Sequence, residues 1–217
     1  MNWLAIVKKE FTLELRKKSV IASLGLYLFS IVFILYLSFG QASMGPVAWT
    51  AFFWVALLFT AVSTIAKSFI GERKGVFVYY YYTVPAGDFI IGKLVYNALL
   101  SSVMGLVGYC LFILFLGDAI QDHVIFLSAL VLASVGFAAS LTLISSLAAK
   151  TNNGSVLMAV LSFPLVVSIL LIAVKLTKNC VDGLGWSASS DELLILGAIN
   201  SLVTALSYLL FPYIWRS

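Results

Sequence analysis

The single histidine of the chain, His123, is the first candidate for chemistry, because imidazole can bind a metal or haem iron or act as a general base. Asp118 and Asp122 stand close to it in the sequence. One histidine lacks the companion ligands that a metal site needs. We interpret His123 as a solvated loop residue, with a haem or metal ligand as the less favoured alternative, and we predict no metal site.

Other catalytic patterns are missing from the sequence. It contains neither the HExxH motif of zinc hydrolases nor the GxxxxGK[ST] loop that binds nucleotide phosphates. The apolar stretches described below carry no aspartate, glutamate, lysine, arginine or histidine in their cores, although ion-coupled transporters usually place such groups there. We therefore predict a non-catalytic chain without catalytic residues or a tightly bound cofactor. Any ATP is expected on a partner.

The segment Lys67–Lys93 is the most patterned part of the chain. Near its start it carries the charged group Glu72-Arg73-Lys74 before Gly75. An apolar, aromatic middle follows, which holds four consecutive tyrosines at 79–82. A simple solvated loop would not hold so many apolar side chains. The middle should bury a face against the lipid interface, where tyrosine is enriched, or against a cytoplasmic partner. Composition leaves these two possibilities open.

The elements that position this segment are membrane spans. The 217 residues are 62% hydrophobic and 10% charged, whereas a soluble domain averages roughly 25% charged residues. Spans of about 20 residues cross about 30 Å of hydrocarbon, and helices satisfy their backbone hydrogen bonds in lipid. We predict an all-α membrane protein, forming one domain over 1–217. Its six transmembrane helices are expected at about 19–39, 46–66, 94–116, 124–149, 154–174 and 193–214.

Basic residues orient these spans. With the N-terminus inside, eleven of the thirteen lysines and arginines fall on the inner side, and only Lys175 and Lys178 fall outside. The positive-inside rule therefore predicts cytoplasmic N- and C-termini. The clustering of charge at span ends also argues against binding to nucleic acid.

Residues 1–18 form an amphipathic pattern. Apolar residues recur every four positions, and most basic residues lie off this stripe. The pattern predicts a helix in the membrane interface, with its apolar face in the lipid; a positively charged flank that orients the first span is the simpler alternative. The predicted anchor residues are Trp3, Val7, Phe11 and Leu15.

Polar, uncharged residues and one proline interrupt the spans. Ser101 with Gly105, and Gly136 with Ser140, have the spacing of small residues at helix–helix contacts, which we favour over a polar transport path. Pro164 removes a backbone hydrogen bond in the fifth span and is expected to kink it. A moving hinge at Pro164 is a possible further role.

The segment Glu72-Arg73-Lys74-Gly75, followed by Pro85 and then Gly92-Lys93, resembles the first cytoplasmic loop of type-2 ABC exporter permeases. The length, the six spans, the basic start and the Phe163-Pro164 stretch further resemble the CcmB branch, the haem exporter permeases of cytochrome c maturation. The tyrosine-rich middle departs from relatives that often carry leucine and acidic residues there.

This resemblance implies a cytoplasmic coupling helix within 67–93 that docks on a separate ABC ATPase subunit. It further implies a second copy of the permease, haem-handling membrane partners and the bacterial inner membrane. ATP hydrolysis would support haem delivery or release of a haem-loaded chaperone, with haem a possible ligand. Rival interpretations are a type-2 exporter of lipid, drug or polysaccharide, and a non-transport scaffold. The implied coupling residues are Glu72, Arg73, Lys74, Gly75, Phe77, Tyr80, Pro85 and Lys93.

Overall fold

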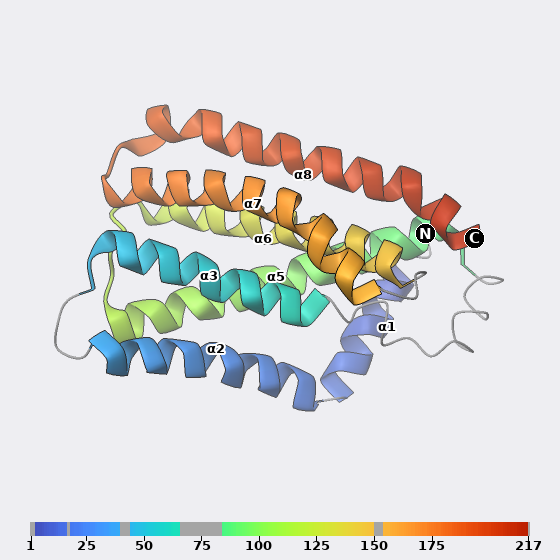
Figure 1. The fold of residues 1–217 in the computed structure, drawn as a ribbon, viewed down its shortest axis with the longest axis horizontal. Helices are drawn as coiled ribbons and strands as arrows, with labels where there is room; N and C mark the ends of the chain where they lie inside the picture. The colour runs from blue at the N-terminus through green and yellow to red at the C-terminus, as the bar shows by residue number, and fades with distance from the viewer. Residues whose placement is uncertain (1–2, 17, 40–43, 66–83, 150–153, 217) are drawn as a thin grey trace.

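The computed structural model describes residues 3–16, 18–39, 44–65, 84–149 and 154–216, and in these ranges the chain forms seven helices and no strand. The predicted all-α fold is confirmed. The helices, labelled as in Figure 1, are α1 (Trp3–Arg16), α2 (Lys18–Phe39), α3 (Pro46–Ile65), α5 (Ala86–Leu116), α6 (His123–Ala148), α7 (Gly154–Val181) and α8 (Gly185–Arg216).

Six of these helices, all except α1, are long and apolar enough to cross a membrane. The prediction of six spans is therefore confirmed. Figure 1 shows the six helices running roughly side by side, whereas α1 crosses them steeply at one end. That end of the bundle, where α1 begins, α5 begins and α8 ends, is called the terminal end below.

Helix α6 forms the centre of the bundle, because it packs against α3, α5, α7 and α8. Small residues allow the close approach: a Cβ at Gly136 would lie 2.5 Å from Asn200 Oδ1, and one at Gly105 would lie 3.1 Å from Ser134 Oγ. Asn97 Nδ2 donates a hydrogen bond of 2.8 Å to the Thr142 hydroxyl. The polar and small residues at these positions therefore serve helix packing.

Three helix ends lie well outside the predicted spans. α5 begins at Ala86 rather than near 94, and most of the polar stretch 175–192 is helical, since α7 continues to Val181 and α8 begins at Gly185. Gly183 and Gly185 have φ values of +65° and +70°, which suit glycine in the tight turn between the helices. The polar residues are accommodated in helices because they meet across this turn; Lys175 Nζ lies 2.6 Å from Glu192 Oε1.

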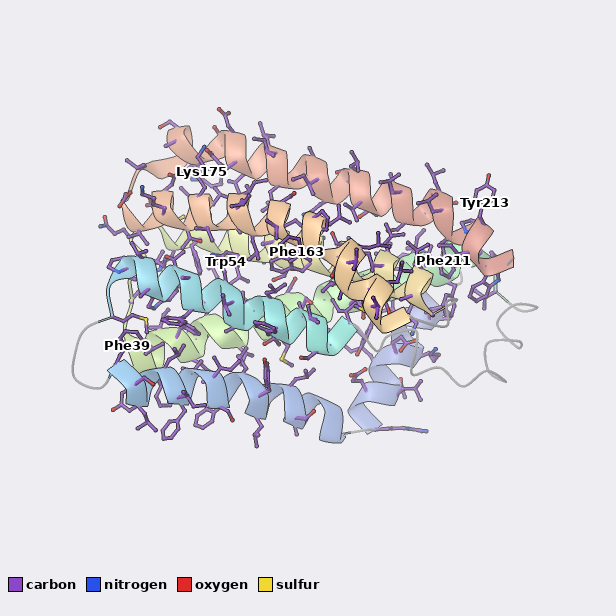
Figure 2. The ribbon with its side chains drawn as sticks, in the orientation of Figure 1. Phe39, Trp54, Phe163, Lys175, Phe211 and Tyr213 are labelled. Atoms are coloured by element: carbon purple, nitrogen blue, oxygen red, sulfur yellow. The ribbon has the colours of Figure 1, made fainter. Side chains whose placement is uncertain are left out.

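Helix α7 continues through Pro164 without breaking. It bends near Phe163, the residue before this proline (Figure 2). A proline inside a helix removes a backbone donor and is a usual cause of such a bend. Ser168 Oγ donates a hydrogen bond of 2.8 Å to the Pro164 carbonyl. A moving hinge at Pro164 stays a prediction.

Candidate functional site

The start of α5 is the point at which the patterned segment enters the bundle. Pro85 stands directly before the helix with φ −59°, which its ring favours. The backbone N–H of Phe89 donates to the Pro85 carbonyl at 3.1 Å, which forms the first helical turn. Phe89 and Ile90 are completely buried. The first turn of α5 is therefore fastened by packing as soon as the helix begins.

Gly92 allows α1 to lie directly against this part of α5. A Cβ added at Gly92 would stand 2.6 Å from Ile6 Cβ and 3.0 Å from the Trp3 carbonyl oxygen. No real side-chain carbon tolerates the shorter distance without movement of a neighbour. Ile6 is buried in this contact. The glycine of the Gly92-Lys93 pair is thus explained by the close approach of two helices.

Lys93 forms the polar centre of the contact between α1 and α5. Its side chain is only 2% exposed, and Nζ lies 3.0 Å from Glu10 Oε1. Lys9 Nζ lies 2.7 Å from the same carboxylate oxygen. Lys93 Nζ also stands 5.8 Å from the centre of the Phe89 ring. A buried ammonium requires such compensation, since an unpaired charge away from water is strongly unfavourable.

The electrostatics of Glu10 favour its charged form. Burial alone would raise the pKa of this carboxyl, but the charge of Lys93 and the contact with Lys9 outweigh burial and lower the pKa below its ordinary value of 4.5. Glu10 is therefore ionised at neutral pH. The carboxylate that faces Lys93 and Lys9 is thus charged.

A second polar contact joins the same two helices one turn further along. Tyr96 Oη donates a hydrogen bond of 2.5 Å to Glu14 Oε2. The Tyr96 ring also packs edge-to-face against Phe11, with centroids 5.1 Å apart. Glu10 and Glu14 are four positions apart and so share one face of α1. That face is matched to Lys93 and Tyr96 on α5.

The end of α8 holds the start of α5 from another direction. The Phe89 ring lies 4.8 Å from that of Trp215 and 6.0 Å from that of Phe211, and Phe211 and Trp215 are 5.3 Å apart. Figure 2 places Phe211 at the terminal end of the bundle. Aromatic rings at such distances contribute beyond their buried area. The start of α5 is thus fastened to α1 and α8 together, and we call these three helices the terminal-end unit.

The terminal-end unit combines an ion pair with a packed aromatic cluster. Lys93 and Lys9 compensate the charge of Glu10, and the rings of Phe89, Phe211 and Trp215 pack in apolar surroundings. The start of α5 is therefore held by both α1 and α8.

Comparison with known families decides the class of protein. The family model described as CcmB protein matches residues 1–214. The chain belongs to the CcmB family. It is a non-catalytic membrane subunit of an ABC transport system for haem and cytochrome c maturation, and an ABC system implies an ATPase partner. A search of curated proteins found no match.

Most of the coupling residues expected for this CcmB-family chain lie outside the described residues, namely Glu72, Arg73, Lys74, Gly75, Phe77 and Tyr80. The other two frame the start of α5. Pro85 is exposed directly before the helix, and Lys93 is buried against α1. A direct contact of the Lys93 side chain with a partner is therefore not available in this arrangement, because α1 covers it.

The anchor residues predicted for the CcmB-family N-terminus lie on α1. Trp3 and Val7 are half-buried, Phe11 is 38% exposed, and the Leu15 side chain is outside the described residues. Phe11, Leu4 and Leu13 leave an apolar surface for lipid, so the interfacial anchor stays a prediction. The residues of α1 that sequence reasoning missed are Ile6, Glu10 and Glu14. The sequence did offer one signal for them. Glu10 and Glu14 are four positions apart on an otherwise basic helix, so they share one face and need basic or hydroxyl partners on another segment.

At the opposite end of the bundle, His123 opens α6. Its Nδ1 lies 2.8 Å from Tyr109 Oη, its Nε2 lies 3.6 Å from Asp118 Oδ2, and its side chain is 51% exposed. The described part of the chain contains no group of three or more histidine, cysteine or acidic residues placed to hold a metal. His123 therefore fastens the α5–α6 connection to the aromatic core through Tyr109.

Proposed function

We propose that this CcmB-family chain couples ATP hydrolysis by a separate ABC ATPase subunit to haem delivery, or to release of a haem-loaded chaperone, in cytochrome c maturation. The observation that carries the proposal is the Lys93–Glu10 ion pair, which fastens α5 to α1 directly after the segment that resembles a coupling helix. Motion received by residues 72–82 would reach a unit of three helices rather than one free helix end.

The proposed orientation places the terminal-end unit on the cytoplasmic side of the bacterial inner membrane. The distribution of lysine and arginine supports this, because eleven of thirteen lie in segments assigned to that side. The ATPase then meets the terminal end, while His123 and the α7–α8 turn face outward. The exposed apolar residues of α1 rest in the inner leaflet. A second copy of the chain and haem-handling membrane proteins complete the proposed assembly.

Co-purification with the ATPase tests the coupling role. Glu72→Gln combined with Arg73→Gln removes the charged pair of the segment, and Gly75→Trp adds bulk beside it. Both variants are expected to retain less ATPase and to stimulate its hydrolysis less. The matched control is Lys178→Gln with Asp182→Gln, which neutralises an exposed lysine and aspartate at the opposite end and should behave as the native chain.

Two results would contradict the proposal. The first is native ATPase retention and stimulation in both segment variants. The second is that cells lacking the chain still form c-type cytochromes normally, although the native chain stimulates the ATPase. This result would exclude a role in cytochrome c maturation. If the chain binds the ATPase but ATP hydrolysis is the same with the native chain and with the segment variants, a scaffold is favoured over a coupling subunit.

A further inference from the structure

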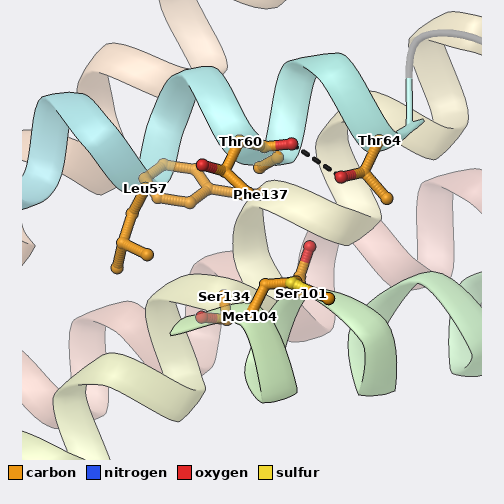
Figure 3. A pocket seen from close by; sticks show the side chains of 8 residues that line it. Leu57, Thr60, Thr64, Ser101, Met104, Ser134 and Phe137 are labelled. Carbon is orange, nitrogen blue, oxygen red and sulfur yellow. Dashed lines mark hydrogen bonds between the residues drawn. The ribbon is translucent and has the colours of Figure 1, made fainter. Parts of the chain in front are cut away.

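A small cavity lies between α3, α5 and α6, well inside the bundle (Figure 3). Four of its lining side chains carry hydroxyl groups, and they come from all three helices: Thr60, Thr64, Ser101 and Ser134. Leu57, Ala61, Met104 and Phe137 complete the wall. Serine and threonine are common where membrane helices pack, so the hydroxyls indicate a polar occupant only where one of them is left without a hydrogen-bond partner.

Ser101 gives the stronger indication. It is only 7% exposed, and its Oγ has no hydrogen-bond partner among the described residues. Figure 3 shows this oxygen directed from α5 into the gap toward α3. Buried hydroxyls in proteins nearly always have a partner, either a protein group or an ordered water. In a membrane bundle, no bulk water replaces a missing partner.

The other hydroxyls are complementary to Ser101. Thr60 Oγ1 donates to the Ala56 carbonyl and Thr64 Oγ1 donates to the Thr60 carbonyl, each at 2.7 Å. Their protons are therefore used, and their oxygens remain as acceptors. Ser101 still has a proton to donate. An occupant that accepts one hydrogen bond and donates others would satisfy this set.

The size of the cavity selects the occupant. The space open to the centre of a water-sized sphere is about 10 Å³, which corresponds to about one water molecule. A buried water typically makes about three hydrogen bonds, and the wall offers four hydroxyl groups. Any larger polar molecule would require the helices to separate.

We propose that this cavity is a specific binding site for one water molecule, which accepts a hydrogen bond from Ser101 and donates to hydroxyl oxygens of α3 or α6. The water joins α5 to α3, the two helices that flank residues 66–85. Among the described residues, the Ser101 hydroxyl makes no such connection by itself. The site is a property of the folded bundle, so it does not depend on which partner binds the terminal end.

Radiolytic hydroxyl-radical labelling with mass spectrometry tests the site, because a bound water irradiated in place oxidises its neighbours. Met104 lines the cavity and is 7% exposed, whereas Met158 is 8% exposed and does not line it. The purified full-length chain should show Met104 oxidised several-fold faster than Met158. Equally slow oxidation of the two methionines would overturn the proposal.

Cavity-filling variants locate the source of the labelling. Ser101→Val from α5 replaces the hydroxyl by a methyl group and adds a second one, and Ala61→Val from α3 adds two methyl groups to the gap. The two variants are independent if one fails to fold. Both should reduce Met104 oxidation to the rate of Met158. Ser102→Val makes the same change outside the cavity wall and should leave the Met104 rate unchanged. Fast Met104 oxidation in both filled variants would show that the water lies elsewhere and would refute the site.

Discussion

Replacing Lys93 by methionine isolates the ion pair that holds α1 on α5. Two unit charges 3.0 Å apart attract by about 5.5 kcal/mol at an effective dielectric constant of 20. Desolvation of each ion offsets several kcal/mol, so the intact pair contributes little net stability, whereas removing one partner costs about 3–5 kcal/mol. Lys9 remains 2.7 Å from Glu10 and lowers that cost. We therefore expect Lys93→Met to destabilise the chain by about 3 kcal/mol.

The matched second change is Glu10→Met. Alone, it leaves the Lys93 ammonium buried without its carboxylate and should destabilise the fold by a similar amount. With Lys93→Met, it replaces the pair by apolar side chains of similar length. Such replacements are often neutral or stabilising, so the double variant should recover most of the loss. The coupling energy between the two positions should therefore approach the sum of the two single losses, about 5 kcal/mol.

Reversible unfolding in mixed detergent micelles, followed by tryptophan fluorescence, measures the four proteins of this cycle. Lys8→Met is the control, since Lys8 is an exposed lysine on the same helix and surface changes usually stay within about 0.5 kcal/mol. The reasoning is refuted if Lys93→Met lies within about 0.5 kcal/mol of the native chain, the usual range of surface changes. It is also refuted if the double variant loses the sum of the single losses.

The same unfolding measurement tests three further predictions. Gly92→Leu places a Cβ 2.6 Å from Ile6 Cβ and should destabilise the fold by about 1–3 kcal/mol through overpacking, with partial rescue by Ile6→Ala. Trp215→Ala should cost about 3–5 kcal/mol because it empties the ring cluster around Phe89; a loss typical of a surface position would contradict the buried cluster. Glu10 has a lowered folded pKa, so stability from its pair is fully present above the ordinary value of 4.5 and is lost as the pH falls through the lowered value. The difference in unfolding free energy between the native chain and the Glu10→Met, Lys93→Met variant should therefore stay constant from about pH 7 to about pH 5, and a decline in that interval would contradict the assigned shift.

Local composition was sufficient to predict the six membrane helices. Each needs only an apolar stretch of about 20 residues, because hydrocarbon thickness and internal hydrogen bonding dictate the rest. The packing role of Gly105 and Gly136 was also predictable from their spacing with serine. Helix ends were less predictable. The start of α5 at Ala86 depends on burial of Phe89 beneath α8, which no local pattern reveals.

The position of Lys93 shows why the site was only partly predictable. A lysine at the end of an apolar stretch is ordinarily a marker of topology, with its ammonium in the interface. Here it lies inside the protein because Glu10, far away in the sequence, comes to meet it. The amphipathic pattern of α1 was ambiguous in a related way, because the apolar face of a helix can be buried in lipid or against another helix. Pairing between distant segments had to be seen in three dimensions.

The ion pair and the Tyr96 hydrogen bond also impose an order on biogenesis. Glu14 and Tyr96 are separated by 82 residues, so α1 emerges from the ribosome long before its partner on α5 exists. During that interval Glu10 and Glu14 must stay hydrated at the membrane surface, and the apolar side chains of α1 can rest in lipid. Docking then follows insertion of α5, and the ring of Trp215 closes the arrangement after α8 has been made. A chain in which α5 has been inserted before α1 docks would hold the Lys93 ammonium without the Glu10 carboxylate.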